Sequence, residues 1–444
     1  MQEPLITVIL PSLNVEKYIR ECLDSVIHQS FEKLEILCID AGSVDGTREI
    51  LETYAEFDSR VKVVYSDVKS YGAQINVGIA MAKGKYVGVV ETDDFIENHM
   101  FEKLYSIAEE NNLDFVKADF RGFRTLRNGK YIYDEGRIWK NDDLYGKVVS
   151  VELFPELYLR DVSIWKGIYK TEFIRQNAIT LNETKGAAFQ DIGFEHLFLR
   201  FAKRGMYIKD VLYFYRRDNS NSSSNKPYGI RFAYQEYKRL MELPLAGGDT
   251  EYFEHYLYAR MIVVFVGEYE KLLDYDANLV YDFRKDIDWF KEILYVKISE
   301  HEISKTDVDD NVWGKLNLLM SDEEAFCKKW RNEREIQKKA EQDWIARIGA
   351  YRTIIFGCGY LGGRCLLLCD KHKLNVAAFS DNKSDLWGTE YYGYGVCEPE
   401  ELKAKYKDTK IIITAKKYEE TIQEQLLTMG ISKERIVLYS DCLM

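Results

Sequence analysis

The first 120 or so residues alternate short apolar runs with amphipathic stretches. Apolar runs typical of buried strands occur at residues 6–10, 34–39, 61–65 and 86–90. Between them, hydrophobic positions recur at helical spacing at residues 15–29, 46–57 and 73–83. Such alternation, with strands that are apolar on both faces, predicts a mostly parallel sheet covered by helices.

The pattern changes twice along the rest of the chain. Residues 120–227 are less regular, with a hairpin signal at residues 127–130 and a polar, loop-like run at residues 216–224. Long, aromatic-rich amphipathic stretches follow, and the last 95 or so residues return to alternating strand and helix signals. We therefore expect an α/β domain at residues 1–227, an α-helical linker or assembly domain at residues 228–348, and a small α/β domain at residues 349–444.

The composition is that of an ordinary folded protein. Of the 444 residues, 46% are hydrophobic and 30% are charged, and the formal net charge is -12. Nucleic-acid binding requires a basic surface that neutralises phosphates, so this charge argues against a nucleic-acid partner. One metal ion and a few well-placed cations still suffice to hold a single phosphorylated ligand.

Three sequence features favour a cytoplasmic location. The start of the chain lacks the basic and apolar regions of a signal peptide. The most apolar stretch, residues 261–267, is far too short to cross a bilayer, so we expect no transmembrane segment. The eight cysteines are scattered without a CxxC pair, which is typical of core thiols in a reducing compartment.

A cluster of acidic residues follows the fourth predicted strand. Glu91, Asp93 and Asp94 place three carboxylates within four residues, directly after a buried strand. Confining like charges there is unfavourable unless a cation neutralises them, and Mn2+ or Mg2+ binds carboxylates while leaving positions open for phosphate. The structural alternative is that these acids stabilise the positive N-terminus of the next helix.

Three further motifs lie in register with this cluster, each beside a predicted strand. They are residues 11–19 (PSLNVEKYI), 39–47 (IDAGSVDGT) and 84–86 (GKY). With this order and spacing, residues 5–225 resemble the family 2 glycosyltransferases, whose nucleotide-sugar-binding fold is known as GT-A. Two positions depart from the family pattern, because Ala41 stands where a second acid is usual and the acidic triplet begins with Glu91 instead of Asp.

The resemblance implies how a nucleotide-sugar donor is held. Pro11 and Asn14 would shape the loop that lies against the nucleoside, and Asp40 would accept a hydrogen bond from the base, uracil. Asp93 would hold a divalent metal ion, Mn2+ or Mg2+, that bridges the donor diphosphate. Glu91 would lie near the ribose or near water molecules on the metal.

Two other parts of the site follow from the same resemblance. Asp94 would support the metal site from behind. Arg216 and Arg217 open the polar run and could close over the diphosphate once the donor binds. A solvated charged loop is the alternative for this pair.

The candidate catalytic base lies in a second acidic motif, FQDIGFE, at residues 189–195. The resemblance implies that Asp191 takes the proton from the acceptor hydroxyl while its oxygen attacks the anomeric carbon, which gives single displacement with inversion. Gln190 stands where the family usually has Glu, and without that neighbouring charge we expect Asp191 to be ionised at pH 7. The alternative is that Asp191 caps the helix that contains Glu195 and His196.

A glycine motif opens the C-terminal α/β region. Gly357, Gly359 and Gly362 form GxGxxG between a predicted strand and helix, and Asp381 follows about twenty residues on, which is the context of a dinucleotide site. The remaining length is enough for only one mononucleotide-binding half. The region resembles the small Rossmann-like modules appended to some bacterial glycosyltransferases, which implies a structural or assembly role, or occasional binding of a nucleotide or sugar phosphate.

The sequence thus predicts an inverting, metal-assisted hexosyltransferase. It would move a hexose or N-acetylhexosamine from a UDP-sugar to a hydroxyl of a growing glycan, in a cell-surface polysaccharide or a glycoprotein, at or near the cytoplasmic membrane face. The apolar helical faces of residues 228–348 favour a homo-oligomer. Two other classes stay open: a non-catalytic nucleotide-sugar-binding or scaffold protein, and an NAD-dependent enzyme that uses the C-terminal glycine motif.

Overall fold

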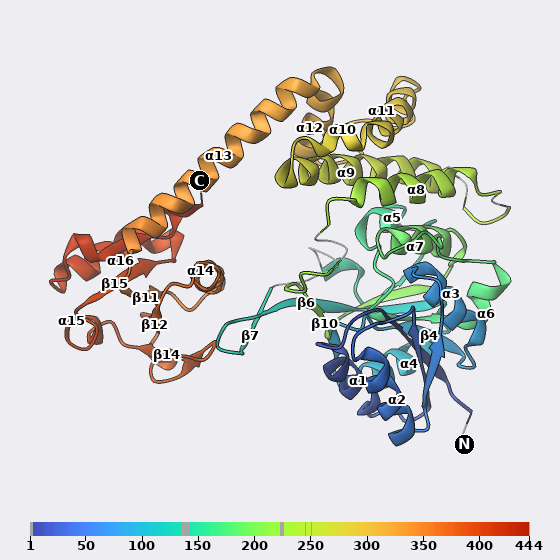
Figure 1. Cartoon of the computed structure of the whole chain (residues 1–444), viewed down its shortest axis with the longest axis horizontal. Helices are drawn as coiled ribbons and strands as arrows, with labels where there is room; N and C mark the ends of the chain where they lie inside the picture. The colour runs from blue at the N-terminus through green and yellow to red at the C-terminus, as the bar shows by residue number, and fades with distance from the viewer. Residues whose placement is uncertain are drawn as a thin grey trace. The chain divides into compact units, whose positions relative to one another are not determined.

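The computed structural model of the chain describes residues 3–134, 138, 142–222, 226–244, 246–249 and 251–443. It divides into two compact units (Figure 1). The first unit comprises Met1–Gly122 and Asp134–Phe326, and the second comprises Phe123–Tyr133 and Cys327–Met444.

A mixed sheet organises the N-terminal part of the first unit, with the strand order β3-β2-β1-β4-β9-β6-β10-β5. The first four strands run parallel to their neighbours, whereas β9 pairs antiparallel with both β4 and β6. The bounds are β1 (Ile6–Ser12), β2 (Leu34–Asp40), β3 (Val61–Tyr65), β4 (Tyr86–Val89), β5 (Phe95–Ile96), β6 (Phe115–Thr125), β8 (Val148–Val149), β9 (Gly167–Lys170) and β10 (Gly205–Arg216). The predicted parallel α/β core is confirmed, and the irregular stretch after it supplies the antiparallel strands.

Helices cover both faces of this sheet. Side chains of α1 (Ile19–Ile27), α2 (Thr47–Phe57) and α4 (Met100–Glu110) share one hydrophobic core with the strands. Helix α3 (Tyr71–Met81) packs on β1 and β2, where Gly78 leaves room for Ile9, because an added Cβ would lie 2.7 Å from the Ile9 side chain. The central strands β1 and β2 are therefore covered by α3 and share a core with α1, α2 and α4.

The remaining helices of the first unit follow the sheet strands. Their bounds are α5 (Leu157–Arg160), α6 (Thr171–Gln176), α7 (Gln190–Phe201), α8 (Gly229–Glu242), α9 (Glu251–Tyr275), α10 (Leu279–Asp282), α11 (Arg284–Ser299) and α12 (Asp310–Ser321). Helix α9 lies at the centre of the helical region and packs on α8, α10, α11 and α12, and also on α5 and α7. Aromatic side chains such as Phe265, Tyr269 and Phe290 are buried there. The predicted helical middle region is confirmed, and its large apolar side chains find partners inside the first unit.

The second unit is built on a separate sheet with the order β13-β14-β12-β11-β15-β16. The bounds are β11 (Arg352–Phe356), α14 (Tyr360–Lys371), β12 (Val376–Ser380), β13 (Glu390–Tyr391), β14 (Tyr394–Cys397), α15 (Glu401–Ala404), β15 (Thr409–Ile413), α16 (Glu419–Thr428) and β16 (Ile436–Leu438). Helix α13 (Glu323–Ile348) leads into this sheet and buries Trp344 against it. A C-terminal sheet domain is thus confirmed.

Residues Phe123–Tyr133, which are the end of β6, a turn and β7 (Tyr131–Tyr133), are part of the second unit, although they lie some 200 residues earlier in the sequence. Leu126 and Ile132 belong to the same hydrophobic cluster as Trp344. At the turn, Arg127 donates from Nε to the Asp370 carboxylate at 2.9 Å. The hairpin signal in the sequence therefore marks a segment that completes the core of the C-terminal sheet domain.

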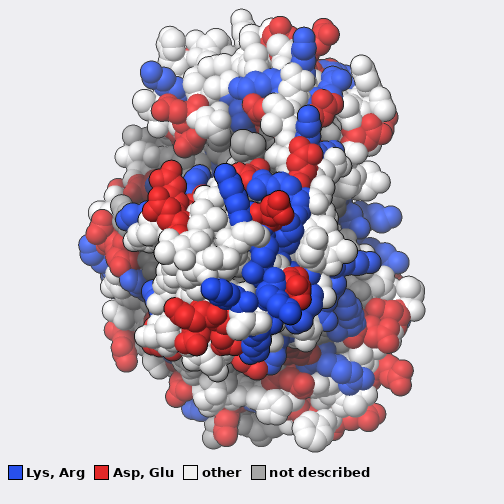
Figure 2. All heavy atoms as spheres, turned by 90° about the vertical axis from the view of Figure 1, so that its left-hand side faces the viewer, with Lys and Arg blue, Asp and Glu red and all other residues white. Residues whose placement is uncertain are grey.

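Charge is distributed unevenly between the two units. The second unit contains 23 Lys and Arg against 17 Asp and Glu, whereas the whole chain contains 61 against 73. Lys and Arg side chains gather on the face drawn in Figure 2. No helix within the described ranges is long and apolar enough to cross a membrane.

Candidate active site

The acidic cluster lies just beyond the end of β4, and each of its carboxylates has a different hydrogen-bond partner. Tyr71 donates its hydroxyl to Glu91 at 2.5 Å. Asn219 donates its side-chain amide to Asp93 at 2.7 Å. Asp94 is 1% exposed and accepts hydrogen bonds from the Tyr213 hydroxyl and from a backbone amide at the end of β10. The cluster is thus held between β4, α3 and β10.

These carboxylates are crowded and short of positive charge. Burial, together with the charges of Asp93 and Asp191, raises the pKa of Glu91 to about 8. Burial also raises the pKa of Asp93, although Asn219 opposes the shift, and it raises the pKa of Asp94 well above its ordinary value, with Asp93 and Glu91 adding to the effect. An excess of buried negative charge is the condition in which a bound cation stabilises a site most.

Arg216 lies against this cluster but does not neutralise it directly. Its Nε donates to the backbone carbonyl of Asp93 at 2.8 Å, and its Nη2 pairs with Glu21 at 2.5 Å. The guanidinium also lies 4.7 Å from the centre of the Tyr18 ring. The structure therefore brings Arg216 to the predicted site and fixes its orientation. The end of the polar run, residues 223–225, lies outside the described residues.

The predicted nucleoside loops are tied to one another. Asn14 has a positive φ of 55°. Its side-chain oxygen accepts a hydrogen bond from the Val44 backbone amide at 2.8 Å, and its backbone amide donates to the Ser43 hydroxyl at 2.9 Å. Pro11 is in β1, and its carbonyl accepts the Thr92 hydroxyl at 2.8 Å. These contacts join the loops after β1 and β2 to the acidic cluster.

Asp40 occupies the end of β2 and is 0% exposed. Its carboxylate accepts the backbone amides of Gly42 and Ser43 and pairs with Arg48 Nε at 2.6 Å. In this structure Asp40 therefore shapes the loop in which the predicted base contact would lie. The role of Asp40 toward a nucleotide base stays a prediction.

Asp191 is the second residue of α7 and follows Gln190, the position at which the sequence differs from the family pattern. The helix is entered through Phe189, whose φ of 67° turns the chain sharply. Gln190 is buried and closes the preceding loop through the amide of Ala188 and the hydroxyl of Thr184. Burial raises the pKa of Asp191 to about 6, opposed by the Ile192 amide and by the charge of Arg260. A carboxyl group with this pKa is mostly ionised at pH 7, as a general base requires.

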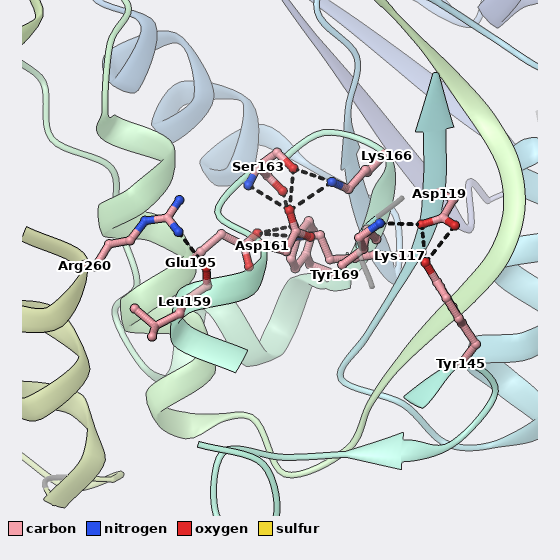
Figure 3. A network of polar contacts seen from close by, with 11 residues as sticks. Lys117, Asp119, Tyr145, Leu159, Asp161, Ser163, Lys166, Tyr169, Glu195 and Arg260 are labelled. Carbon is pink, nitrogen blue, oxygen red and sulfur yellow. Dashed lines mark hydrogen bonds and ion pairs between the residues drawn. The ribbon is translucent and has the colours of Figure 1, made fainter. Parts of the chain in front are cut away.

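A buried ionic cluster includes Glu195 of α7, the helix that carries Asp191 (Figure 3). Lys117 Nζ lies 2.7 Å from Asp161 Oδ2 and 2.9 Å from Glu195 Oε1. Lys166 Nζ lies 2.9 Å from Asp161 Oδ1. Tyr169 also donates to Glu195. Since Glu195 lies one helical turn after Asp191, this cluster fixes the orientation of α7.

Some of the candidate donor residues and the candidate base line one cavity of about 480 Å³, whereas Pro11, Asn14, Asp40 and Arg216 are not among its lining residues. Glu91, Asp93 and Asp191 all contribute to its wall. Aromatic side chains contribute too, among them Tyr71, Trp165 and Tyr215. The helical region supplies another wall of the cavity, formed by Gly229, Arg260, Val264, Glu268 and Lys271. The cavity therefore combines acids for a metal ion, an acid for proton transfer and two cations.

The chemistry of the acids fits a divalent metal ion that is shared with a substrate. No group of three or more His, Cys, Asp and Glu side chains in the described part of the chain forms a ready-made metal cage. Mg2+ and similar ions are commonly held by one or two carboxylates plus substrate phosphates. Glu91 and Asp93 face the same cavity, and their mutual repulsion is the charge imbalance that such an ion relieves.

The C-terminal glycine motif has the predicted placement between a strand and a helix. Gly357 has φ of +118°, and a Cβ added at Gly362 would lie 2.0 Å from the Gly357 carbonyl oxygen, so both positions require glycine. Gly359 is the N-cap of α14. Asp381 follows β12, and its carboxylate accepts the backbone amide of Cys358 at 2.8 Å. This acid thus holds the glycine loop, and a nucleotide at this motif stays a prediction.

The sequence interpretation missed several residues of the cavity. Tyr71 and Asn219 hold Glu91 and Asp93, and Arg260 and Lys271 come from the helical region. The apolar and polar pattern around these residues is that of ordinary helices and loops. Nothing in the local sequence marks these residues, because only the packing of distant elements brings them to the site.

Comparisons with known proteins agree with this architecture. Residues 7–151 match the family described as Glycosyl transferase family 2, and residues 349–437 match the family described as C2185-like, N-terminal. The crystal structure of S. aureus TarS 1-349 in complex with UDP-GlcNAc has a TM-score of 0.53 and 20% identity, and the match covers 76% of this chain and 92% of that chain. This likeness shows a shared GT-A fold.

Two curated relatives are glycosyltransferases by name. Glycosyltransferase GlyG of Streptococcus pneumoniae serotype 4 (strain ATCC BAA-334 / TIGR4) is 27% identical over 307 residues, which cover 66% of this chain and 94% of GlyG. The uncharacterized glycosyltransferase EpsJ of Bacillus subtilis (strain 168) is 31% identical over 226 residues, which cover 51% of this chain and 64% of EpsJ. The protein is accordingly a glycosyltransferase that carries a domain of family 2.

Proposed function

We propose that the chain is an inverting, metal-assisted transferase that moves a hexose or N-acetylhexosamine from a UDP-sugar to a hydroxyl group of a growing glycan. The observation that carries this proposal is the single cavity that joins Glu91 and Asp93 to Asp191. Glu91 and Asp93 would then hold the donor through a metal-bound diphosphate, and Asp191 would take the proton from the acceptor in the same cavity. The UDP-GlcNAc in the TarS complex supports a UDP-sugar as the donor class.

The residues of the cavity divide the work of the reaction. Asp93, with Glu91 beside it, would hold Mn2+ or Mg2+ against the donor diphosphate. The bound ion would supply positive charge to the departing nucleoside diphosphate. Pro11, Asn14 and the loop held by Asp40 would lie against the nucleoside.

Asp191 would act on the acceptor. Its carboxylate takes the proton of the acceptor hydroxyl while the oxygen forms a bond to the anomeric carbon and the bond to the UDP oxygen breaks. The new glycosidic bond forms on the face opposite the leaving group, so the anomeric configuration inverts. The proton passes to Asp191, the sugar passes to the acceptor oxygen and UDP leaves, so the reaction needs no covalent enzyme intermediate.

We further propose that the protein works in a reducing compartment at an anionic surface such as the cytoplasmic membrane face. All eight cysteines are free, which agrees with a cytoplasmic location. The surplus of Lys and Arg in the second unit, including the exposed Lys403, Lys405 and Lys407, suits attraction to anionic lipid headgroups. Flotation with vesicles of phosphatidylglycerol and with neutral vesicles tests this, and equal recovery with both would refute it.

The second unit would have a structural role in this scheme, as a Rossmann-like module. The hairpin residues Leu126 and Ile132 complete its hydrophobic core. Homo-oligomerisation stays a prediction: much of the apolar helical surface that suggested it is packed inside the first unit, whereas Tyr281 and Tyr295 are exposed.

The proposed reaction is tested by a donor screen. The full chain is incubated with UDP-glucose, UDP-galactose, UDP-GlcNAc and UDP-GalNAc, each with Mn2+ and with EDTA, and released UDP is measured. We expect release from at least one donor with Mn2+ and a large loss in EDTA. If no sugar nucleotide is bound or turned over under either condition, a binding or scaffold role replaces the enzymatic one.

A further inference from the structure

One face of helix α9 forms a wall of the active-site cavity. Arg260, Val264, Glu268 and Lys271 all line the cavity, and their spacing of four, four and three residues places them on one side of the helix. At 1.5 Å per residue the stripe is about 16 Å long. The helical region therefore takes part in the site and does more than connect the two sheet domains.

The two cations of this stripe have different surroundings. Lys271 Nζ lies 3.4 Å from Glu268, its neighbour on the stripe. Arg260 instead donates from Nη1 to the backbone carbonyl of Leu159 at 2.6 Å (Figure 3). That bond fixes the guanidinium, because Leu159 lies two residues before Asp161 of the buried ionic cluster.

The Nε–H of Arg260 is buried and has no hydrogen-bond partner within the described residues. Leaving a buried charged donor unpaired is unfavourable, so such a group in a cavity wall indicates a ligand oxygen that completes it. Arg260 and Asp191 line the same cavity, and the charge of Arg260 acts on the Asp191 carboxylate. A substrate group in this cavity can therefore be reached from both side chains.

We propose that Arg260 binds the acceptor opposite Asp191, with its Nε–H donating a hydrogen bond to an oxygen of the acceptor sugar beside the hydroxyl that Asp191 deprotonates. This inference rests on the proposed function. It assigns the acceptor to the α9 side of the cavity and the donor to the side of Glu91 and Asp93. Trp165 and Tyr215, which also line the cavity, give that space aromatic walls of the kind that pack on sugar rings.

The charge of Arg260 also stabilises the ionised form of Asp191. Groups from several elements act on this carboxylate: Arg260 of α9 favours its charge, and Asp161, after α5, opposes it. Glu91, Tyr71, Glu236 and Tyr237 face it from β4, α3 and α8. Arg260 is the cation that lowers the pKa of Asp191 against burial.

The test uses the full chain and compares water with a panel of methyl glycosides of glucose, galactose, GlcNAc and GalNAc as acceptors. UDP release from the best donor of the screen is measured against pH for the wild type, Arg260→Gln, Arg260→Lys and the control Arg331→Gln, which changes an exposed arginine of α13 that is not among the residues lining the cavity. Affinity for UDP with Mn2+ is measured in parallel. We expect Arg260→Gln to lower UDP release to an acceptor sugar about tenfold more than release to water, and to move the acidic limb of the profile upward by about one pH unit, with UDP affinity unchanged.

The two controls separate charge from hydrogen bonding. Arg260→Lys should restore the acidic limb, because it keeps the charge, while UDP release to an acceptor sugar stays low, because an ammonium cannot place a donor where Nε lies. Arg331→Gln should resemble the wild type in both respects.

Four outcomes would overturn the inference. Wild-type release to the acceptor sugar and an unshifted limb in Arg260→Gln, or a panel in which no sugar raises wild-type UDP release above hydrolysis, would contradict this inference and leave the proposed function standing. A loss of UDP affinity in both Arg260 variants would show a structural role. A wild type that releases no UDP from any donor would remove the proposed function and this inference with it, before any variant is compared.

Discussion

Two groups of buried carboxylates lie close together in the first unit, and only one of them is neutralised. Lys117 pairs with both Asp161 and Glu195, and Lys166 pairs with Asp161; the two lysines hold the pKa of Asp161 well below its usual range, while burial raises the pKa of Glu195 to about 7 against the charge of Lys117. Asp94 is equally buried and Glu91 and Asp93 are half-buried, and the pKa of all three is raised with no lysine paired to them among the described residues. A cluster with its own cations maintains the fold, whereas one without them is suited to a cation that arrives with the substrate.

The two groups meet on helix α7, where Asp191 and Glu195 lie one turn apart. Asp191→Asn should lower transfer by about 10²–10⁴-fold, because the general base is lost, while UDP affinity and thermal stability stay near those of the wild type. Glu195→Gln should show the opposite pattern, a lower melting temperature with a smaller loss of turnover per folded molecule. Transfer rates, UDP titration and thermal unfolding of both variants check this. Equal losses of UDP binding and activity in Asp191→Asn would make that residue structural.

Removing Lys117 should leave Asp161 and Glu195 with too little positive charge, as in the acidic cluster after β4. Lys117→Met leaves Asp161 and Glu195 with a single lysine, and breaking a buried pair in this way costs about 3–5 kcal/mol. Urea unfolding measures the loss. The matched control is Lys103→Met, whose partner Asp210 is on the surface and whose removal should cost about 1 kcal/mol or less. Similar losses in both variants would contradict the distinction between the two groups.

Asp93→Asn tests the metal assignment of the charged group. We expect the Mn2+-dependent gain in UDP affinity to fall at least tenfold, because the carboxylate that faces the cavity is lost while the fold is kept. Isothermal titration of UDP with Mn2+ and with EDTA measures the difference. Asp381→Asn, at the corresponding strand end of the second unit, is the control that should leave the metal-dependent gain intact.

The raised pKa of Glu91 predicts a smaller effect, a change in thermal stability that depends on pH. A carboxyl group whose pKa rises from 4.5 to about 8 on folding favours the folded state at low pH, and this contribution is lost as the pH rises through 8. Without metal, Glu91→Gln should therefore raise the melting temperature more at pH 8 than at pH 5. Thermal unfolding at both pH values, with the exposed Glu110→Gln as the control, measures the difference. A gain that is the same at both pH values would mean that Glu91 is not the source.

Much of the sheet and one side of the site could be predicted from local sequence. The strand at residues 61–65 has the predicted bounds, and Asp40, Asp93 and Asp191 lie where strand ends and a helix start were predicted. The first helix begins at Ile19 and not at residue 15, because the Val15 amide is bound by Thr47 and Tyr18 turns back on the Val15 carbonyl. Local periodicity does not show such contacts between distant loops.

The other side of the site could not be predicted because long-range packing assembles it. Arg260 lies in a helix whose pattern is that of a buried bundle element, and only the packing of α9 on α5 and α7 brings it to Asp191. Asn219 follows β10 in a polar run that reads as an ordinary loop, yet it holds Asp93. Residues 127–130 announce a hairpin, but nothing local indicates that it completes a core formed more than 200 residues later.

The most direct test of the account is UDP release from the preferred UDP-sugar by three proteins: wild type, Asp93→Asn and Asp191→Asn. Each is measured with Mn2+ and with EDTA, alongside UDP affinity. The account predicts that EDTA removes most wild-type turnover, that Asp93→Asn is slow and insensitive to Mn2+, and that Asp191→Asn binds UDP with Mn2+ but turns over at least a hundredfold more slowly. Wild-type turnover that is unchanged in EDTA and in both variants would contradict it.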